Sequence, residues 1–271
     1  PLPLRLLFQA PSAAQLAPAI ERLTPDAASD LPLVGAPDDT GAPLTFQQER
    51  LWFLETLNGG APDEEISAPA AGRDLLADAD RARQAYLIPL CLQLRGTLDV
   101  PALKTALTRL VATQASLRTR VVVTEQGLVH QQVDPAAAPA LSEIDLRGLG
   151  QDAQQDRVQR LAFQPFDLTK SWPLRCALLR RGPADWTLLL TLHHLAADGW
   201  SLQLLEKLLQ RHYQAALDSS LSSASQEGDQ RQPDGDPGAP SISYLDYARW
   251  QRARQAQGAF DRDLAYWRKQ L

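Results

Sequence analysis

A short stretch in the last third of the chain carries two adjacent histidines, His193 and His194, followed by Asp198 and Gly199. It follows the apolar run 188–192 and precedes a helical pattern, so it is predicted to be the turn between a strand and a helix. Histidine exchanges protons near neutral pH, and a glycine at a helix start lets another group approach the backbone closely. This stretch is therefore the candidate site of chemistry.

The two histidines are not expected to bind a metal together. Adjacent residues of a strand face opposite sides, so His193 and His194 cannot both point into one cleft. Zinc-binding histidines more often lie four residues apart on a helix, and only His130 and His212 remain as further histidines. A plainer interpretation makes one histidine a hydrogen-bonded core residue and Asp198 a helix cap. The doubled histidine with Asp-Gly at this spacing favours a site of chemistry.

The composition excludes several classes of protein. With 44% hydrophobic and 22% charged residues, the 271-residue chain is not disordered throughout. Its net charge of −5, without a basic stripe, argues against nucleic-acid binding, and no apolar run approaches the roughly 20 residues of a membrane helix. Cys91 and Cys176 each lie in an apolar run and are expected to be reduced core residues. Without a signal peptide, a cytoplasmic protein is expected.

By its composition and patterning, the chain divides into three segments. Residues 1–23 contain a capping-box spacing, Ser12 to Gln15, and a helical stripe that Pro18 should kink or weaken. Residues 24–43 are rich in Pro, Asp, Gly and Ala and are predicted to be a linker. Residues 44–271 carry the pattern of a globular unit. Its final apolar stripe reaches the last residue without a cap, so it is expected to need a packing partner. The stripe consists of Phe260, Leu264, Trp267 and Leu271.

Helices and strands alternate through this unit. A helix should run from the Thr45–Gln48 capping box to residue 57, with Arg50 inside its apolar face and therefore in need of a partner. That face is expected to comprise Phe46, Arg50, Phe53, Leu54 and Leu57. A strand is predicted at 87–95, a helix after Asp99, a hairpin at 118–133, and a strand pair at 174–180 and 186–192.

The helix that begins at Gly199 should run to residue 217. Its buried side is expected to carry Leu204, Leu205, Leu208 and Leu209, with Trp200 in the core. Residues 61–84 hold at most one short helix, and residues 218–240 are predicted to be an unstructured loop. The intermixed elements indicate an α/β or α+β class with a substantial sheet.

Four motifs in order now identify a resemblance. Residues 193–199 match the HHxxxDG motif of condensation domains from nonribosomal peptide synthetases, relatives of chloramphenicol acetyltransferase. Residues 45–52 are similar to the family's opening motif SxAQxRLW, 117–119 to the end of RHExLRT, and 244–251 to YxDFAxWQ. The motif positions outside 193–199 are Arg50, Trp52, Arg118, Tyr244, Asp246 and Trp250.

This resemblance implies a fold and a domain order. The fold is an α/β (α+β sandwich) lobe like that of chloramphenicol acetyltransferase, with a mixed sheet flanked by helices. Residues 44–271 would be the N-terminal lobe of a two-lobed condensation domain, whose second-lobe motifs this sequence lacks, and the isolated lobe is expected to be inactive. Residues 1–23 resemble the C-terminal end of a peptidyl carrier protein, whose phosphopantetheine serine would lie upstream.

The resemblance also implies an activity and its partners. An amine on a downstream carrier would attack an aminoacyl or peptidyl thioester on an upstream carrier. Both substrates arrive on phosphopantetheine arms, so no cofactor or metal binds the chain directly. Expected partners are the two carriers, the second lobe and the adenylation domain of the same synthetase, with neither nucleic acid nor membrane.

Roles of single residues follow from the same resemblance. His194 is expected to be the catalytic residue, either as a general base or as a positioning group. Gly199 would contribute near the oxyanion. His193, Asp198 and Arg118 would support the site, with the carboxylate of Asp198 buried against Arg118.

One departure and two alternatives remain. Where the family has Arg-His-Glu, this sequence has Thr113-Gln114-Ala115, so any role of that histidine and glutamate is absent or replaced. A condensation-like module that only docks carriers is one alternative. An epimerization domain also carries HHxxxDG, although the opening at residues 50–52 favours condensation. A heterocyclization domain is disfavoured because it replaces both histidines.

Overall fold

The computed structural model describes residues 6, 9–21, 31–35, 40–59, 83–223 and 242–271. The chain divides into two units, Pro1–Leu33 and Val34–Leu271. In the first unit, the sequence predicts a helix after Ser12, and α2 (Ala13–Glu21) forms there with Pro18 inside it. The Leu16 N–H donates to the Ser12 carbonyl at 2.8 Å and closes the first turn.

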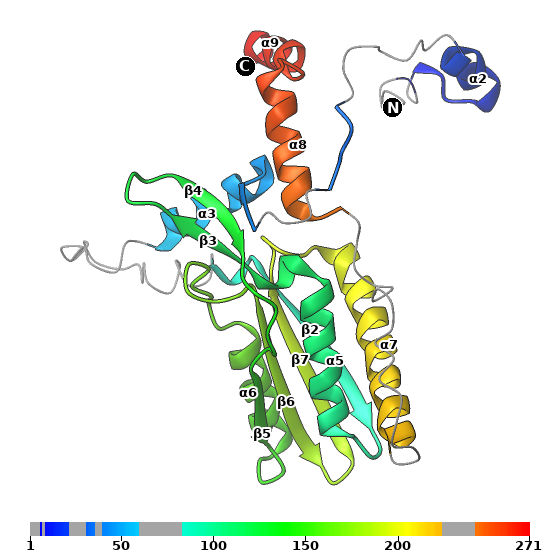
Figure 1. Cartoon of the computed structure of the whole chain (residues 1–271), viewed down its shortest axis with the longest axis vertical. Coiled ribbons are helices and arrows are strands. Elements are labelled where there is room, and N and C mark those ends of the chain that lie inside the picture. Colours follow the sequence, from blue (N-terminus) through cyan, green and yellow to red (C-terminus); the bar gives the residue numbers. More distant parts are fainter. Residues whose placement is uncertain (1–5, 7–8, 22–30, 36–39, 60–82, 224–241) are drawn as a thin grey trace. The chain divides into compact units, whose positions relative to one another are not determined.

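A four-stranded sheet in the order β2-β7-β6-β5 is the centre of the second unit (Figure 1). Its strands are β2 (Leu87–Arg95), β5 (Leu141–Asp145), β6 (Leu174–Gly182) and β7 (Asp185–His193). β2 and β6 run antiparallel to β7, whereas β5 runs parallel to β6, so the sheet is mixed. The three strands predicted from the sequence are confirmed, and β5 is an addition.

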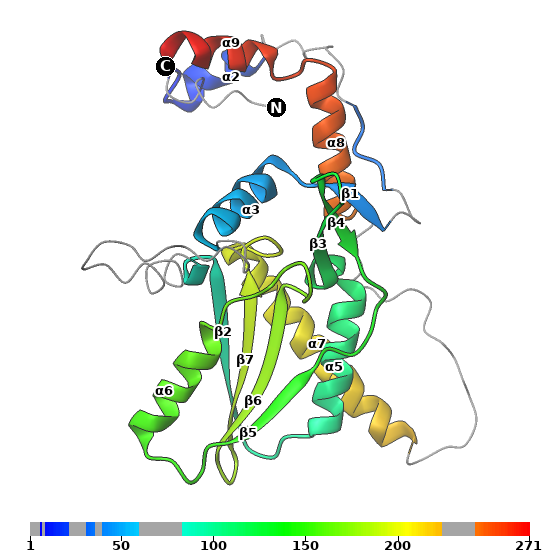
Figure 2. The same cartoon turned by 90° about the vertical axis from the view of Figure 1, so that its left-hand side faces the viewer.

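Helices cover both faces of this sheet, as the sequence predicts for an α/β sandwich. Figure 2 shows α6 (Gln151–Ala162) on one side and α5 (Val100–Thr113) with α7 (Gly199–Ser223) on the other. Side chains of β7 alternate accordingly: Leu188, Leu190 and Leu192 pack toward α5 and α7, and Leu189 packs toward α6. The Asp99 carboxylate accepts the Ala102 N–H at 2.8 Å and caps α5, as predicted.

A smaller antiparallel sheet has the order β1-β4-β3. The 3-10 turn η1 (Ala115–Arg118) leads into β3 (Thr119–Val123), which pairs with β4 (Val129–Val133). Gly127, with φ of 78°, occupies the left-handed region in the turn between them, so the predicted hairpin is confirmed. β1 (Gly41–Pro43) is formed by residues that the sequence assigns to the linker.

Three further helices lie near the small sheet or follow it in the chain: α3 (Phe46–Gly59), α8 (Tyr244–Ala256) and α9 (Asp261–Gln270). The predicted capping box of α3 is present, because the Gln48 N–H donates to Thr45 Oγ1 at 3.1 Å and the Thr45 N–H donates to Gln48 Oε1 at 2.9 Å. No residue of α9 is buried, and Leu264 and Trp267 of its apolar stripe are exposed.

The predicted apolar face of α3 is only partly correct, because Phe46 and Leu54 are half-buried but the other three residues are not. Arg50, Phe53 and Leu57 are exposed, whereas Gln48 is buried and Trp52 is half-buried. The helix packs through the face that carries Gln48 and Trp52, because its neighbours there include polar groups that a glutamine can satisfy. Hydrophobic periodicity in the sequence does not predict a packing face that includes a buried glutamine.

Smaller corrections concern exposure and helix length. Cys91 is exposed because it lies in the edge strand β2, out of phase with Leu90 and Leu92, which are half-buried and pack against the core. Trp200 is 81% exposed and Leu204 is exposed, so neither lies in the core. α7 continues to Ser223, into the predicted loop. Helix α6 was not predicted, because only Val158 and Ala162 of its residues are buried. Residues 61–82 and 224–240 lie outside the described residues.

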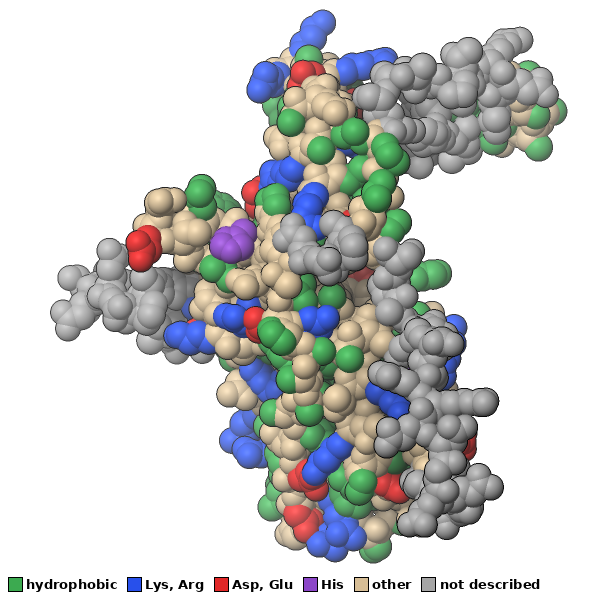
Figure 3. Space-filling view, in the orientation of Figure 1, with side chains coloured by type: hydrophobic (Ala, Val, Ile, Leu, Met, Phe, Trp, Pro, Cys, Tyr) green, Lys and Arg blue, Asp and Glu red, His purple; other side chains and the backbone are tan. Residues whose placement is uncertain are grey.

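The surface carries charges of both signs. On the face shown in Figure 3, basic side chains are interspersed with acidic and apolar ones over the coloured residues. None of the helices in the described ranges combines the length and apolar character needed to cross a membrane.

Candidate active site

The two adjacent histidines sit where β7 gives way to the loop before α7, and they have opposite environments. His193, the last residue of β7, is 1% exposed, whereas His194 is exposed. This follows from strand geometry, since neighbouring residues face opposite sides of the sheet. The prediction that the pair cannot share one cleft is confirmed, and only His194 is presented to solvent.

His193 is held at both ring nitrogens. Its Nε2 lies 2.9 Å from Oε1 of Glu55 on α3, and its Nδ1 accepts the Leu195 N–H at 3.0 Å. The rings of Phe166 and Tyr86 lie beside it, with centroids 6.2 and 6.4 Å from the imidazole. His193 is therefore a hydrogen-bonded core residue, and sequence reasoning did not identify its partner Glu55.

Hydrogen bonds hold the backbone on both sides of His194. The His194 N–H donates to the Tyr86 carbonyl at 2.8 Å, and the Ala196 N–H donates to the His193 carbonyl at 2.9 Å. Leu195 is buried in a cluster with Val121 and Leu168, and its carbonyl accepts from Gln48 Nε2 at 3.4 Å. The loop is thus fixed while the His194 side chain stays accessible.

Asp198 caps α7 and does not form the predicted buried ion pair. It is exposed, and its Oδ1 accepts the Ser201 N–H at 2.9 Å and the Ser201 hydroxyl at 2.7 Å. The Asp198 N–H donates in return to Ser201 Oγ at 3.2 Å. Hydrogen bonds from Ser201 hold the pKa of the Asp198 carboxyl below its usual range, ahead of smaller backbone contributions. The plainer interpretation of Asp198 as a helix cap is the one that the structure supports.

Arg118 instead donates hydrogen bonds to backbone carbonyls of α5 and of the residue that follows β4. Its Nε donates to the Val111 carbonyl at 3.3 Å, and its Nη1 donates to the backbone carbonyl of Asp134. The Asp134 carboxylate binds Arg120 through two hydrogen bonds of 2.6 and 2.8 Å and accepts from the Trp172 indole at 2.8 Å. The expected pairing of Arg118 with Asp198 is therefore wrong, because each group has nearer partners.

A hollow of about 250 Å³ opens beside His194. Residues of the loop, of η1 and of the first turns of α7 and α8 form it. The lining comprises Ser116, His194, Leu195, Ala196, Ala197, Asp198, Ser201 and Tyr244. The site residue His194 and the motif residue Tyr244, which are 50 positions apart in the numbering, thus share one cavity.

Gly199 begins α7 between two of the lining residues but does not line the hollow itself. A Cβ added at Gly199 would meet no atom within 4 Å in the described chain. The space beside the Gly199 backbone is therefore open among the described residues.

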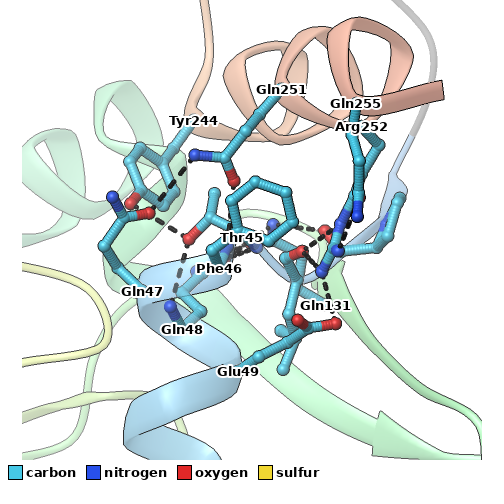
Figure 4. Close-up of polar contacts among 12 residues, drawn as sticks. Thr45, Phe46, Gln47, Gln48, Glu49, Gln131, Tyr244, Gln251, Arg252 and Gln255 are labelled. Atoms are coloured by element: carbon cyan, nitrogen blue, oxygen red, sulfur yellow. Dashed lines mark hydrogen bonds and ion pairs between the residues drawn. The ribbon is translucent and has the colours of Figure 1, made fainter. Parts of the chain in front are cut away.

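The first and last motifs contact each other beside this hollow (Figure 4). The Phe46 N–H at the start of α3 donates to Oε1 of Gln251 on α8 at 2.9 Å, and the hydroxyl of Thr45 lies 3.4 Å from that of Tyr244. Burial raises the pKa of the Tyr244 hydroxyl above its ordinary value. These contacts set the position of Tyr244 over the hollow.

Arg252 strengthens the same junction. Its Nε and Nη2 donate to the Leu44 carbonyl at 3.0 and 2.6 Å, its guanidinium pairs with Glu49, and it lies 4.5 Å from the centre of the Phe46 ring. We call this set of contacts between the start of α3 and α8 the α3–α8 junction. Gln48, from the same first turn, pairs its amide with that of Gln131 on β4 at 3.0 Å.

The remaining motif residues have structural positions. Trp52 packs against the buried cluster that contains Leu195. Asp246 completes the capping box of α8 with Ser243, and the Trp250 ring stacks near Tyr247 with centroids 5.6 Å apart. Arg50 is exposed, so the expectation of a buried arginine is wrong. Within the described ranges, no group of three or more His, Cys, Asp or Glu side chains is placed to hold a metal ion.

Comparisons with known proteins identify the family of the chain. The family model of the condensation domain matches residues 71–271. The chain is 36% identical over 98% of its length to a probable non-canonical nonribosomal peptide synthetase of Salinispora arenicola, and 31% identical over its full length to a linear gramicidin synthase of Brevibacillus parabrevis. It covers 3% and 5% of these relatives, respectively.

Solved structures share the fold. The X-domain from teicoplanin biosynthesis aligns with a TM-score of 0.65 and 26% identity, over 88% of this chain and 45% of that one. The starter condensation domain of rhizomide synthetase aligns with a TM-score of 0.60 and 21% identity, over 86% and 48%. With a matching family model over most of its length and relatives above 30% identity, the chain belongs to the condensation domain family of nonribosomal peptide synthetases.

Proposed function

We propose that this domain forms an amide bond between two carrier-bound substrates, with His194 at the reacting atoms. The observation that carries the proposal is the exposed imidazole of His194 on a hollow, on a loop whose backbone is hydrogen-bonded on both sides. Such a group is positioned before substrate arrives, which is where enzymes gain rate from orientation.

The reaction joins an amine nitrogen to a thioester carbonyl carbon. The amine attacks the carbonyl, the C–N bond forms, and the C–S bond then breaks to release the thiol of the upstream phosphopantetheine arm. One proton leaves the nitrogen and one reaches the sulfur, so the reaction balances without an oxidant or a reductant. His194 is the group placed to receive the nitrogen proton, or to hold the amine in line.

The start of α7 supplies the electrostatic setting. A helix N-terminus carries partial positive charge, and Gly199 and the capped Asp198–Ser201 turn lie there beside the hollow. We assign the backbone of Gly199 to the stabilisation of the tetrahedral oxygen. Tyr244 closes the other side of the hollow and is held by the α3–α8 junction.

The partners follow from the family and the chemistry. Both substrates would arrive as thioesters on phosphopantetheine arms of carrier domains, and residues 1–23 would be the end of such a carrier. A second lobe would complete the site, and the adenylation domain of the same synthetase would load the acceptor carrier. Because the chain spans only 3–5% of the curated relatives described above, these partners and both substrates are part of the proposal.

The product formed by the complete synthetase distinguishes the candidate functions. Donor and acceptor carriers are loaded with labelled aminoacyl groups, and the acceptor arm is analysed by mass spectrometry and chiral chromatography. A new amide on the acceptor arm is the expected result. Inversion of an α-carbon without amide formation would indicate an epimerization domain, and carrier binding without either reaction would indicate a docking module; both would contradict the proposal.

A further inference from the structure

Glu55 has a position that no motif assigned to it. It lies on α3, seven residues after Gln48 and so on the same side of the helix. Its side chain is only 13% exposed, and its Oε1 is 2.9 Å from Nε2 of His193. A carboxylate removed from water in this way needs a donor, and His193 is the donor present.

The hydrogen bonds fix the protonation pattern of His193. A backbone N–H can only donate, so the 3.0 Å contact from Leu195 requires a lone pair on Nδ1 of His193. In the neutral imidazole the proton then lies on Nε2, where the Glu55 carboxylate accepts it. Glu55 and the Leu195 N–H therefore favour the same ring form, one at each nitrogen.

Leu195 directly follows His194, and residues of α3 contact its backbone on both sides. The Leu195 N–H donates to the His193 ring, which in turn is hydrogen-bonded to Glu55, and the Leu195 carbonyl accepts from Gln48 at 3.4 Å. If His193 took the other tautomer, Nδ1–H would face the Leu195 N–H and the loop would have to move. The position of His194 is thus coupled to a carboxylate on another element.

We propose that Glu55 is a positioning residue for the condensation reaction: it holds His193 with the proton on Nε2 and thereby fixes the loop that presents His194. This inference rests on the proposed function of His194. It differs from a purely structural role for the buried pair, because it requires the tautomer of His193 and the rate of bond formation to change together.

Two substitutions separate these roles. Glu55→Ala removes the acceptor, so we expect a second tautomer of His193 and a kcat reduced between about 10-fold and 100-fold, with little change in KM. Glu55→Gln keeps an oxygen that can accept from Nε2, so it should retain the tautomer and most of the activity. Glu125→Ala, which removes an exposed carboxylate in the β3–β4 turn, is the control and should change neither quantity.

The tautomer is read on the 271-residue chain from two-bond ¹H–¹⁵N spectra of ¹⁵N-histidine, and kcat is measured in the complete synthetase. An unchanged tautomer in Glu55→Ala, or a changed tautomer with wild-type kcat, overturns the proposal. So does a Glu55→Gln variant that keeps the tautomer yet loses as much activity as Glu55→Ala. The proposed function fails separately, through an active His194→Ala variant, because the nitrogen spectra do not depend on turnover.

Discussion

His193 and His194 are adjacent in the chain, yet one is a core residue and the other faces a cavity. The buried ring is hydrogen-bonded at both nitrogens, so it cannot exchange protons with a substrate without breaking the contacts of the loop. The exposed ring is free to do so. At the scale of single residues, the division of labour in the motif therefore follows from strand alternation and from two hydrogen bonds.

The separation of Asp198 from Arg118 can be tested by a double-mutant cycle. Asp198→Ala should cost about 1 kcal/mol in the free energy of unfolding, because it removes a helix cap. Arg118→Ala should cost about 1–3 kcal/mol, because it leaves two carbonyls without their donor. The groups share no hydrogen-bond partner among the described residues, so the double variant should equal the sum within about 0.5 kcal/mol. A larger coupling energy in denaturant titrations would show that the Asp198 and Arg118 side chains interact directly.

Asp134 should make the domain sensitive to acid. The hydrogen bond from Arg120 holds the pKa of the Asp134 carboxyl below its usual range, with burial opposing it. A carboxyl with a lowered folded pKa stabilises the fold above its unfolded pKa of about 3.9, and this contribution is lost as pH falls through the folded pKa. The free energy of unfolding should therefore fall toward acid pH, and Asp134→Asn should make that fall shallower.

Denaturant titrations between about pH 5 and pH 3 measure this slope. Asp152→Asn, which removes an exposed carboxylate in the first turn of α6 and leaves the Arg120 contact intact, is the control. Equal slopes for wild type and Asp134→Asn would show that the Arg120 pairing does not contribute.

At the scale of elements, α3 connects the site to the rest of the lobe. Its first turn binds α8 through Gln251, Gln48 contacts the loop at Leu195, and Glu55 holds His193. The helix therefore positions both the histidine loop and the tyrosine that closes the hollow. Its packing face places the polar side chains of Gln48 and Glu55 beside apolar ones such as Trp52, so specific hydrogen bonds position the helix in addition to apolar contacts.

The α3–α8 junction should be sensitive to Gln251. Gln251→Ala leaves the Phe46 N–H without its acceptor at a site where Gln251 is 5% exposed, so the free energy of unfolding should fall by about 1–3 kcal/mol. Bond formation should slow as well, because the start of α3, whose Thr45 contacts Tyr244, would be held less firmly against α8. Gln257→Ala, at the exposed C-terminal end of the same helix, should stay within about 0.5 kcal/mol of wild type. Thermal melts that do not separate these two variants would contradict the described junction.

The sequence predicts elements whose signals are local. Capping residues located the starts of α3 and α5, and β-type runs located β2, β6 and β7, because these signals act within a few residues. Helix α6 and the packing face of α3 were not predicted from the sequence, because both bury few apolar residues. The partners of Asp198, Arg118 and His193 were not predicted for another reason. Glu55, for example, is 138 positions from His193 in the sequence, and only the fold brings the two together.

At the scale of the whole molecule, the unit Val34–Leu271 exposes large apolar side chains of the kind that partners cover. Trp200 in the first turn of α7 and Trp267 on α9 are 81% and 58% exposed. The chain also spans less than half of the X-domain and starter condensation domain structures to which it is similar. Both observations support the proposal that a second lobe completes the site.

The 271-residue chain alone should therefore show no appreciable condensation. With loaded donor and acceptor carriers, we expect no amide product above the uncatalysed background, because the substrates are not held in line by one lobe. Adding the second lobe should restore product and slow the exchange of α9 amide hydrogens. Turnover by the chain alone near that of a complete condensation domain would contradict the two-lobed account.

The central claim is that His194 acts on the substrates while the surrounding contacts only position it. Its most direct test is the single-turnover rate of amide formation in the complete synthetase with preloaded carriers, compared for wild type and His194→Ala. We predict a rate lowered by at least about 100-fold and a melting temperature within about 2 °C of wild type, because an exposed side chain contributes little to stability. A variant with an unchanged rate, or one that loses activity only because it unfolds, would contradict the account.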